Sequence, residues 1–163
     1  MLPRALTRTP PTSLPLRSSA LAARNRSDRD VRLPPSRIVR EGPPPDDLLL
    51  VVRGGRESLS DAILERATTD SWETYRFFGV SVFGVADDDL SRLSAREPAI
   101  RRRAEVRVAR VGALRGGGFE VVATFGNPAH YSVVMAEASA SMFQAVRSCF
   151  SPPQPNPGYE PDR

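Results

Sequence analysis

The sequence predicts an α+β fold, a single small domain built on a mixed, largely antiparallel sheet of about five strands with about three helices. Two patterns support this class. Runs with strand spacing and helix spacing alternate in the first half of the domain, and two strand-like runs separated by a short turn come late. A doubly wound fold would instead continue the strand and helix alternation to the end.

Proline positions set the boundaries of this domain. Nine of the sixteen prolines lie in residues 1–45 and five in residues 151–163, whereas residues 46–150 contain only Pro98 and Pro128. Because proline lacks a backbone N–H and has a fixed φ, such clusters disfavour sheets and helices. We therefore expect a disordered basic arm, then the globular domain, then a disordered proline-rich tail over these three ranges.

The first predicted elements are a strand and a helix. Residues 48–52 are an apolar Leu-Leu-Leu-Val-Val run closed by Arg-Gly-Gly, which is typical of a strand buried on both faces and ended by a turn. Ser58 resembles a helix N-cap. Leu59, Ile63 and Ala67 follow at helical spacing, so we expect this stripe to be the buried face of the helix.

A second strand and a brief helix come next. Residues 80–85 alternate, so Val80 and Val82 are expected on one face of the strand and Ser81 on the other. Three aspartates at 87–89 then provide an N-cap for a brief helix with leucines at helical spacing. These two elements extend the early alternation of strand and helix.

The remaining elements are strands and a closing helix. Residues 104–108 alternate apolar and charged side chains and predict a half-exposed third strand. A Gly-Gly-Gly turn leads to a strand over 119–125, and an Asn-Pro turn reverses the chain into a strand over 131–135, so these two strands should form an antiparallel hairpin. Residues 141–150 carry apolar side chains at helical spacing and predict the closing helix.

The composition restricts the chemistry that the chain can perform. All 23 basic residues are arginines, which excludes a Schiff-base lysine, a Walker P-loop and an amine general base. Cys149 is the single cysteine and His130 the single histidine, so we expect no disulfide and no metal site of the multi-histidine or cysteine kind. His130 stands at a turn that enters a strand, where we expect an exposed polar residue. Catalysis would therefore rest on arginine, hydroxyl and carboxylate groups.

Charge is divided unevenly along the chain. Residues 1–40 carry nine arginines and two acids, a balance of +7, whereas residues 41–163 carry fourteen arginines and seventeen acids, a balance of −3. The basic character therefore belongs to the arm, and the acidic body does not have the electrostatic footprint of a dedicated nucleic-acid binder.

The arm itself has two interpretations. Its composition fits an organelle transit peptide, and it also fits an over-extended reading frame in a GC-rich genome. Because the second interpretation also explains the missing lysines, we expect a cytoplasmic protein. No apolar run approaches the ~20 residues needed to cross a bilayer.

Three residues form the sharpest functional pattern. Arg53 ends the first strand, Ser81 stands on the second, and Glu120 stands on a late strand followed by the hairpin turn. In this order they resemble the Arg-Ser-Glu arrangement of ADP-ribosyltransferases, over roughly residues 48–135. Gly118 stands where that family usually carries a second Glu or Gln.

The resemblance implies a role for each residue. Arg53 would hold the phosphates of NAD, Ser81 would line the nicotinamide-ribose pocket, and Glu120 would bond the ribose hydroxyl. Loss of nicotinamide develops positive charge on the ribose, so a nearby carboxylate stabilises the transition state more than the ground state. The resemblance therefore implies an NAD-dependent transferase of the small bacterial toxin type, with Glu120 and Ser81 as catalytic residues and Arg53 as the cofactor-binding residue.

A competing prediction is a non-catalytic protein-interaction module, one partner of a gene pair. It would bind its protein partner through an aromatic segment that consists of Trp72, Tyr75, Phe77 and Phe78. The same aromatic residues also fit a core cluster. The sequence leaves open whether the chain is an enzyme.

Overall fold

The computed structural model describes residues 43–124 and 126–161, which belong to one compact unit. The arm expected over 1–45 therefore lies outside the described residues, apart from its last three. The strands are β1 (Leu49–Val52), β2 (Phe78–Val85), β3 (Glu105–Val106), β4 (Val108–Arg110), β5 (Glu120–Ala123), β6 (His130–Met135) and β7 (Gln154–Pro155). The helices are α1 (Asp61–Tyr75), α2 (Leu90–Arg96), α3 (Pro98–Arg101), α4 (Val111–Gly116) and α5 (Ala140–Ser148), and short 3-10 turns lie at Gly55–Glu57 and Ala86–Asp88.

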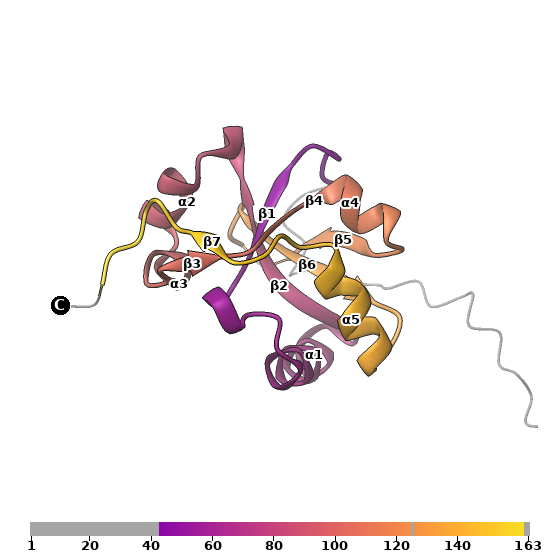
Figure 1. The fold of residues 1–163 in the computed structure, drawn as a ribbon. Helices are drawn as coiled ribbons and strands as arrows, with labels where there is room; N and C mark the ends of the chain where they lie inside the picture. The colour runs from indigo at the N-terminus through magenta and orange to yellow at the C-terminus, as the bar shows by residue number, and fades with distance from the viewer. Residues whose placement is uncertain (1–42, 125, 162–163) are drawn as a thin grey trace, which may run out of the picture. The chain divides into compact units, whose positions relative to one another are not determined.

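Five of these strands form one sheet in the order β4-β1-β2-β6-β5, and every pairing in it is antiparallel (Figure 1). β3 and β7 form a separate two-stranded antiparallel pair. The predicted α+β class is confirmed, and so is the hairpin, because β5 pairs with β6 directly after the turn between them. Both sheets are antiparallel throughout the described residues.

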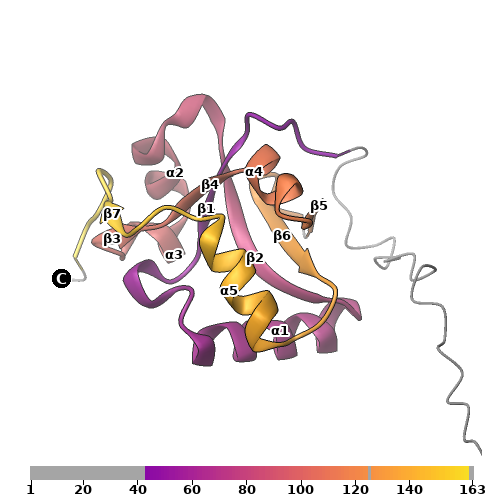
Figure 2. The ribbon, with the colours of Figure 1, turned by 45° about the vertical axis from the view of Figure 1, so that its right-hand side comes forward.

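The first face of the five-stranded sheet carries the larger core. Leu50 and Val52 of β1 and Val82 of β2 project to this face, where α1, α4 and α5 cover them (Figure 2). Leu114 of α4 and Val146 of α5 have no exposed surface. The alternation expected for β2 is confirmed, because Val80 and Val82 face this core and Ser81 faces away from it.

The second face is covered unevenly. Val51 and Phe83 project to it and pack against Leu93 of α2, Ile100 of α3 and Val106 of β3. β1 is therefore buried on both faces, as its continuous apolar run predicts. This smaller core covers β4, β1 and the Phe83–Val85 end of β2 on the second face. The part over β6 and β5 carries polar side chains together with Val134 and Val122, which pack with Tyr75 and Phe77.

The buried stripe of α1 differs from the predicted one. Ile63 is 42 % exposed, and the buried face consists of Leu64, Thr68, Ser71 and Tyr75. Thr68 and Ser71 can be buried because each hydroxyl donates a hydrogen bond, Thr68 to the Leu64 carbonyl at 2.8 Å and Ser71 to the Phe77 carbonyl at 3.0 Å. The predicted stripe consists of apolar residues alone, so it does not include the buried Thr68 and Ser71.

The predicted third strand is split. Residues 104–108 contribute β3 to the small sheet and the start of β4 to the large one. Helix α4 follows directly and was not expected, since it contains Gly112 and ends at Gly116. Packing explains it, because Val111 and Leu114 are both fully buried against the first face.

The C-terminal tail is a correction to the sequence-based expectation. Residues 151–163 were expected to be disordered, but in the described part of this tail, 151–161, β7 pairs with β3 and places Pro155 opposite Glu105. Proline is tolerated at the edge of such a pair because its missing N–H faces away from the ladder. Asn156 is 6 % exposed and fixes the tail by side-chain hydrogen bonds to residues 94–103.

The closing helix is confirmed as α5, with Phe143 and Val146 as its buried residues. Within residues 43–124 and 126–161, none of the helices combines the length and the apolar character needed to span a membrane.

Candidate functional site

The site predicted from the sequence lies on the second face of the large sheet. The register of β1 and β2 ends with Val52 opposite Val82, and Arg53 follows in the turn, one position beyond the pairing. Ser81 is on the same face as Phe83, because side chains alternate along a strand. The charge of Arg53 acts on His130, which is on this same face, so Arg53 lies at the Ser81 end of the two strands and on this side of the sheet.

Glu120 shares this face but lies farther away. Ser81 pairs with Ser132 of β6, and Ser132 pairs with Val122 of β5, which is two residues from Glu120. From the usual strand spacing and rise, the Cα of Glu120 is about 12 Å from that of Ser81 and about 16 Å from that of Arg53. The three residues share a surface, and the whole width of β6 separates the serine from the glutamate.

A buried polar cluster lies beside Ser81, on the side away from Glu120, whereas Val122 and Val134 lie toward Glu120. The Thr124 hydroxyl lies 2.6 Å from Nδ1 of His130 and 3.3 Å from the Ser132 hydroxyl. Thr124 has no exposed surface, Ser132 has 2 % and His130 has 7 %. We call Thr124, His130 and Ser132 the hydroxyl–imidazole cluster.

His130 corrects a prediction, because it was expected at the surface and is buried. Its ring meets Phe83 edge-on at a centroid distance of 5.3 Å. Burial lowers the pKa of His130 below its ordinary value, the positive charge of Arg53 lowers it further, and the hydrogen bond to the Thr124 backbone opposes the shift. The imidazole is therefore neutral at neutral pH and can both donate and accept a hydrogen bond.

Sequence reasoning missed the cluster although a signal was available. His130 and Ser132 are two residues apart on the strand, so they share a face. The hairpin register then brings Thr124 beside His130, where its N–H donates to the His130 carbonyl at 3.2 Å. Carrying the predicted hairpin through to its register would have placed these three side chains together.

An arginine-lined cavity lies beside this surface. Its volume is about 280 Å³, and it is lined by Arg53, Arg102 and Arg103 with Pro98 and Ala99. The two later arginines follow α3, so the cavity joins the end of β1 to the end of that helix. Three guanidinium groups around one opening favour an anion with several oxygens, such as a phosphate or a pyrophosphate.

A glycine helps to shape this cavity. Gly55 has φ +76°, and a Cβ there would meet the side chain of Arg103 at 3.3 Å and the Glu105 carbonyl at 3.2 Å. A larger residue would strain the backbone and push Arg103 away. The Arg-Gly-Gly turn read from the sequence therefore both ends β1 and leaves room for a second arginine.

The aromatic segment proposed as a partner-binding surface divides into two stacked pairs. Tyr75 and Phe77 stack at 5.3 Å and are buried, at 5 % and 3 % exposure, against Val134 on the second face. Trp72 and Phe78 stack at 4.8 Å, and Trp72 remains 37 % exposed. The first pair therefore bounds the candidate site, and the second pair is the one available to solvent.

In the part of the chain that the structure describes, no group of three or more His, Cys, Asp and Glu side chains is arranged to hold a metal ion. Comparison of the chain with protein-family models, with curated proteins and with solved structures found no match. The function is therefore inferred from residues and geometry.

Proposed function

We propose that this domain binds NAD on the second face of its sheet and acts as an ADP-ribosyltransferase-like enzyme. The observation that supports the proposal is that Arg53, Ser81 and Glu120 share that face, with Arg53 also lining the arginine cavity. A cytoplasmic site of action, as expected from the sequence, belongs to the same proposal.

The arginine cavity suits the pyrophosphate. Arg53 would contact it together with Arg102 and Arg103, since guanidinium groups bind phosphate oxygens through paired hydrogen bonds. From there the nicotinamide riboside would have to extend over Ser81 and across β6 to reach Glu120. The buried hydroxyl–imidazole cluster reaches the Ser81 end of that path through Ser132, and nearer Glu120 the path borders the apolar group of Val122 and Val134 with Tyr75 and Phe77.

The reaction needs few groups from the protein. The bond between the ribose C1′ and the nicotinamide nitrogen breaks, and its electron pair neutralises the pyridinium ring. An acceptor then forms a new bond to C1′ and releases its proton. The Glu120 carboxylate would accept a hydrogen bond from a ribose hydroxyl and so stabilise the positive charge that develops on the ribose in the transition state. Ser81 would position the sugar.

The test uses the full chain and NAD labelled in the nicotinamide ring. Wild-type protein should release labelled nicotinamide, and Glu120→Gln should lower the rate by about 10²–10³-fold, as expected when a stabilising charge is lost at a transition state. Arg53→Gln should weaken NAD binding. Glu65→Gln, an exposed change on α1, is the matched control.

Two results would remove the assignment. One is nicotinamide release that Glu120→Gln leaves unchanged while binding is intact. The other is wild-type protein that does not bind NAD.

The interaction module remains the second candidate, favoured by the exposed Trp72 stacked on Phe78. Tyr75 and Phe77 no longer belong to it, because they are buried. If it is correct, a stoichiometric protein partner should co-purify with the wild-type chain and be lost from Trp72→Ser. Retention of the partner by that variant would speak against this surface.

A further inference from the structure

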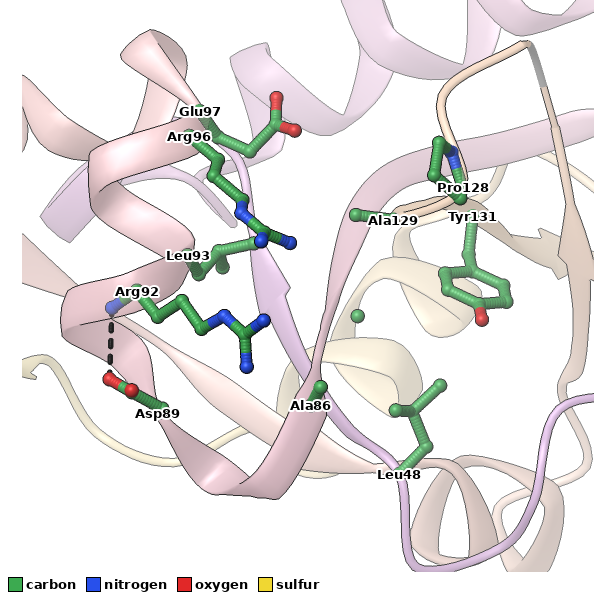
Figure 3. Close-up of a pocket in the computed structure, with 11 residues that line it drawn as sticks. Leu48, Ala86, Asp89, Arg92, Leu93, Arg96, Glu97, Pro128, Ala129 and Tyr131 are labelled. Atoms are coloured by element: carbon green, nitrogen blue, oxygen red, sulfur yellow. Dashed lines mark hydrogen bonds between the residues drawn. The ribbon is translucent and has the colours of Figure 1, made fainter.

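A second cavity lies between α2 and the turn that precedes β6, and it shares no lining residue with the arginine cavity. Its volume is about 210 Å³ (Figure 3). Cavities that hold drug-sized ligands usually measure about 300–1,000 Å³, so this one suits a smaller molecule.

One wall of the cavity is cationic. Arg92 and Arg96 are one helical turn apart on α2, and Figure 3 shows both guanidinium groups reaching toward the open space opposite Ala129. Residues four apart on a helix are neighbours on its surface, so the two guanidinium groups can contact one ligand together.

Two carboxylates, Asp89 and Glu97, also line this cavity, and each accepts a hydrogen bond from a group other than the two guanidinium groups. Asp89 accepts a hydrogen bond from the Arg92 backbone N–H at 2.9 Å and so caps α2. Glu97 accepts from the side chain of Asn127 at 2.8 Å. No ion pair joins Arg92 or Arg96 to a carboxylate within residues 43–124 and 126–161. The guanidinium N–H donors of both arginines are therefore available to a ligand.

The opposite wall is apolar. Figure 3 shows Ala129 across from the arginines, and Leu48 and the ring of Tyr131 beyond the segment that carries Ala86. The Tyr131 ring lies against the backbone of Gly84, where an added Cβ would be only 2.6 Å from a ring carbon. This wall is consequently fixed in place by the sheet, whereas the arginines are exposed side chains of the helix.

We propose that this cavity binds a small carboxylic acid that carries a compact apolar group. Its carboxylate pairs with Arg92 and Arg96, because a guanidinium fork matches the two carboxylate oxygens. Its apolar group lies against the wall formed by Leu48, Ala129 and Tyr131. The site is independent of NAD binding, since it shares no residue with the surface around Arg53.

The experiment measures binding of phenylacetate to the full chain by isothermal titration calorimetry, with phenylacetamide as the uncharged analogue of the same shape. We expect phenylacetate to bind with a dissociation constant in the millimolar range or below and phenylacetamide at least about tenfold more weakly, since the paired charge is lost. The double variant Arg92→Gln, Arg96→Gln should bind phenylacetate at least about tenfold more weakly than the wild-type protein. Arg66→Gln, an exposed arginine on α1, should bind like wild type.

A second variant tests the apolar wall. Ala129→Leu adds bulk to the cavity while keeping both arginines, so it should abolish binding. The proposal is overturned by absence of binding at millimolar phenylacetate, by equal binding of the amide, or by undiminished binding to the double glutamine variant. If Ala129→Leu does not fold, the arginine variants and the amide decide the question.

Discussion

Replacing Asn156 by alanine should destabilise the domain markedly, although the residue lies in a segment rich in proline. Its side-chain amide donates to the Ile100 carbonyl at 3.0 Å and to the Arg103 carbonyl at 2.9 Å. Its oxygen accepts from the Ser94 hydroxyl at 2.9 Å and from the Gly158 N–H at 3.1 Å. One side chain therefore ties the tail to α2 and α3.

The magnitude follows from these four hydrogen bonds. Each contributes on the order of 1 kcal/mol net, and a buried group left without a partner costs about 1–3 kcal/mol. Ser94 is fully buried, whereas the bonds to Arg103 and Gly158 are only part-buried and water can replace them. We expect Asn156→Ala to lower the free energy of unfolding by about 2–4 kcal/mol.

Urea unfolding followed by the fluorescence of Trp72, the single tryptophan, measures this change. Asn156→Asp should lower the free energy of unfolding at least as much at neutral pH, because the aspartate lacks both amide donors and its negative charge would face two carbonyl oxygens. Gln154→Ala, in the same segment, should cost less than about 0.5 kcal/mol, as usual for a surface substitution. An Asn156→Ala protein as stable as the Gln154→Ala protein would refute the reasoning.

Two further changes test the core and the buried histidine. Gly79→Ala should lower the free energy of unfolding in urea by about 1–3 kcal/mol, because the new Cβ would lie 2.7 Å from the ring of Phe77. Gly116→Ala is the control, because a Cβ at Gly116 would meet nothing within 4 Å, and it should leave stability unchanged or raise it. Equal effects of the two changes would contradict the packing described here. Because the folded-state pKa of His130 lies below its ordinary 6.5, the unfolded chain binds the proton more tightly, so stability should fall as pH drops below 6.5 toward the folded-state pKa. Urea unfolding between pH 7.5 and about 5 should show that loss in wild type and less of it in His130→Gln, and equal pH profiles would contradict it.

The parts of the fold that the sequence predicts are those set by local spacing. A continuous apolar run identifies β1. Alternation of side chains identifies β2 and the β5–β6 hairpin, because a strand presents successive side chains to opposite faces. The same alternation places Ser81 and Glu120 on one face of their strands, which is the second face of the large sheet. These inferences depend only on neighbours in the chain.

The parts that the sequence does not predict depend on distant partners. Helix α4 has two glycines and forms because Leu114 is buried under the sheet. The tail is ordered because Asn156 meets carbonyl groups that lie more than fifty positions earlier in the chain. His130 is buried because Phe83 of another strand covers it. No local pattern contains this information.

The order of the strands has a consequence for how the chain folds. Leu49 pairs with Arg110, Phe83 pairs with His130, and Val106 pairs with Gln154, so only the β5–β6 hairpin joins segments that are close in sequence. Domains dominated by such non-local pairings fold on the order of milliseconds to seconds, because the chain loses loop-closure entropy before the favourable contacts form. During synthesis the small sheet can form only once β7 has followed β3 out of the ribosome, and until then the edge of β3 is without its strand partner.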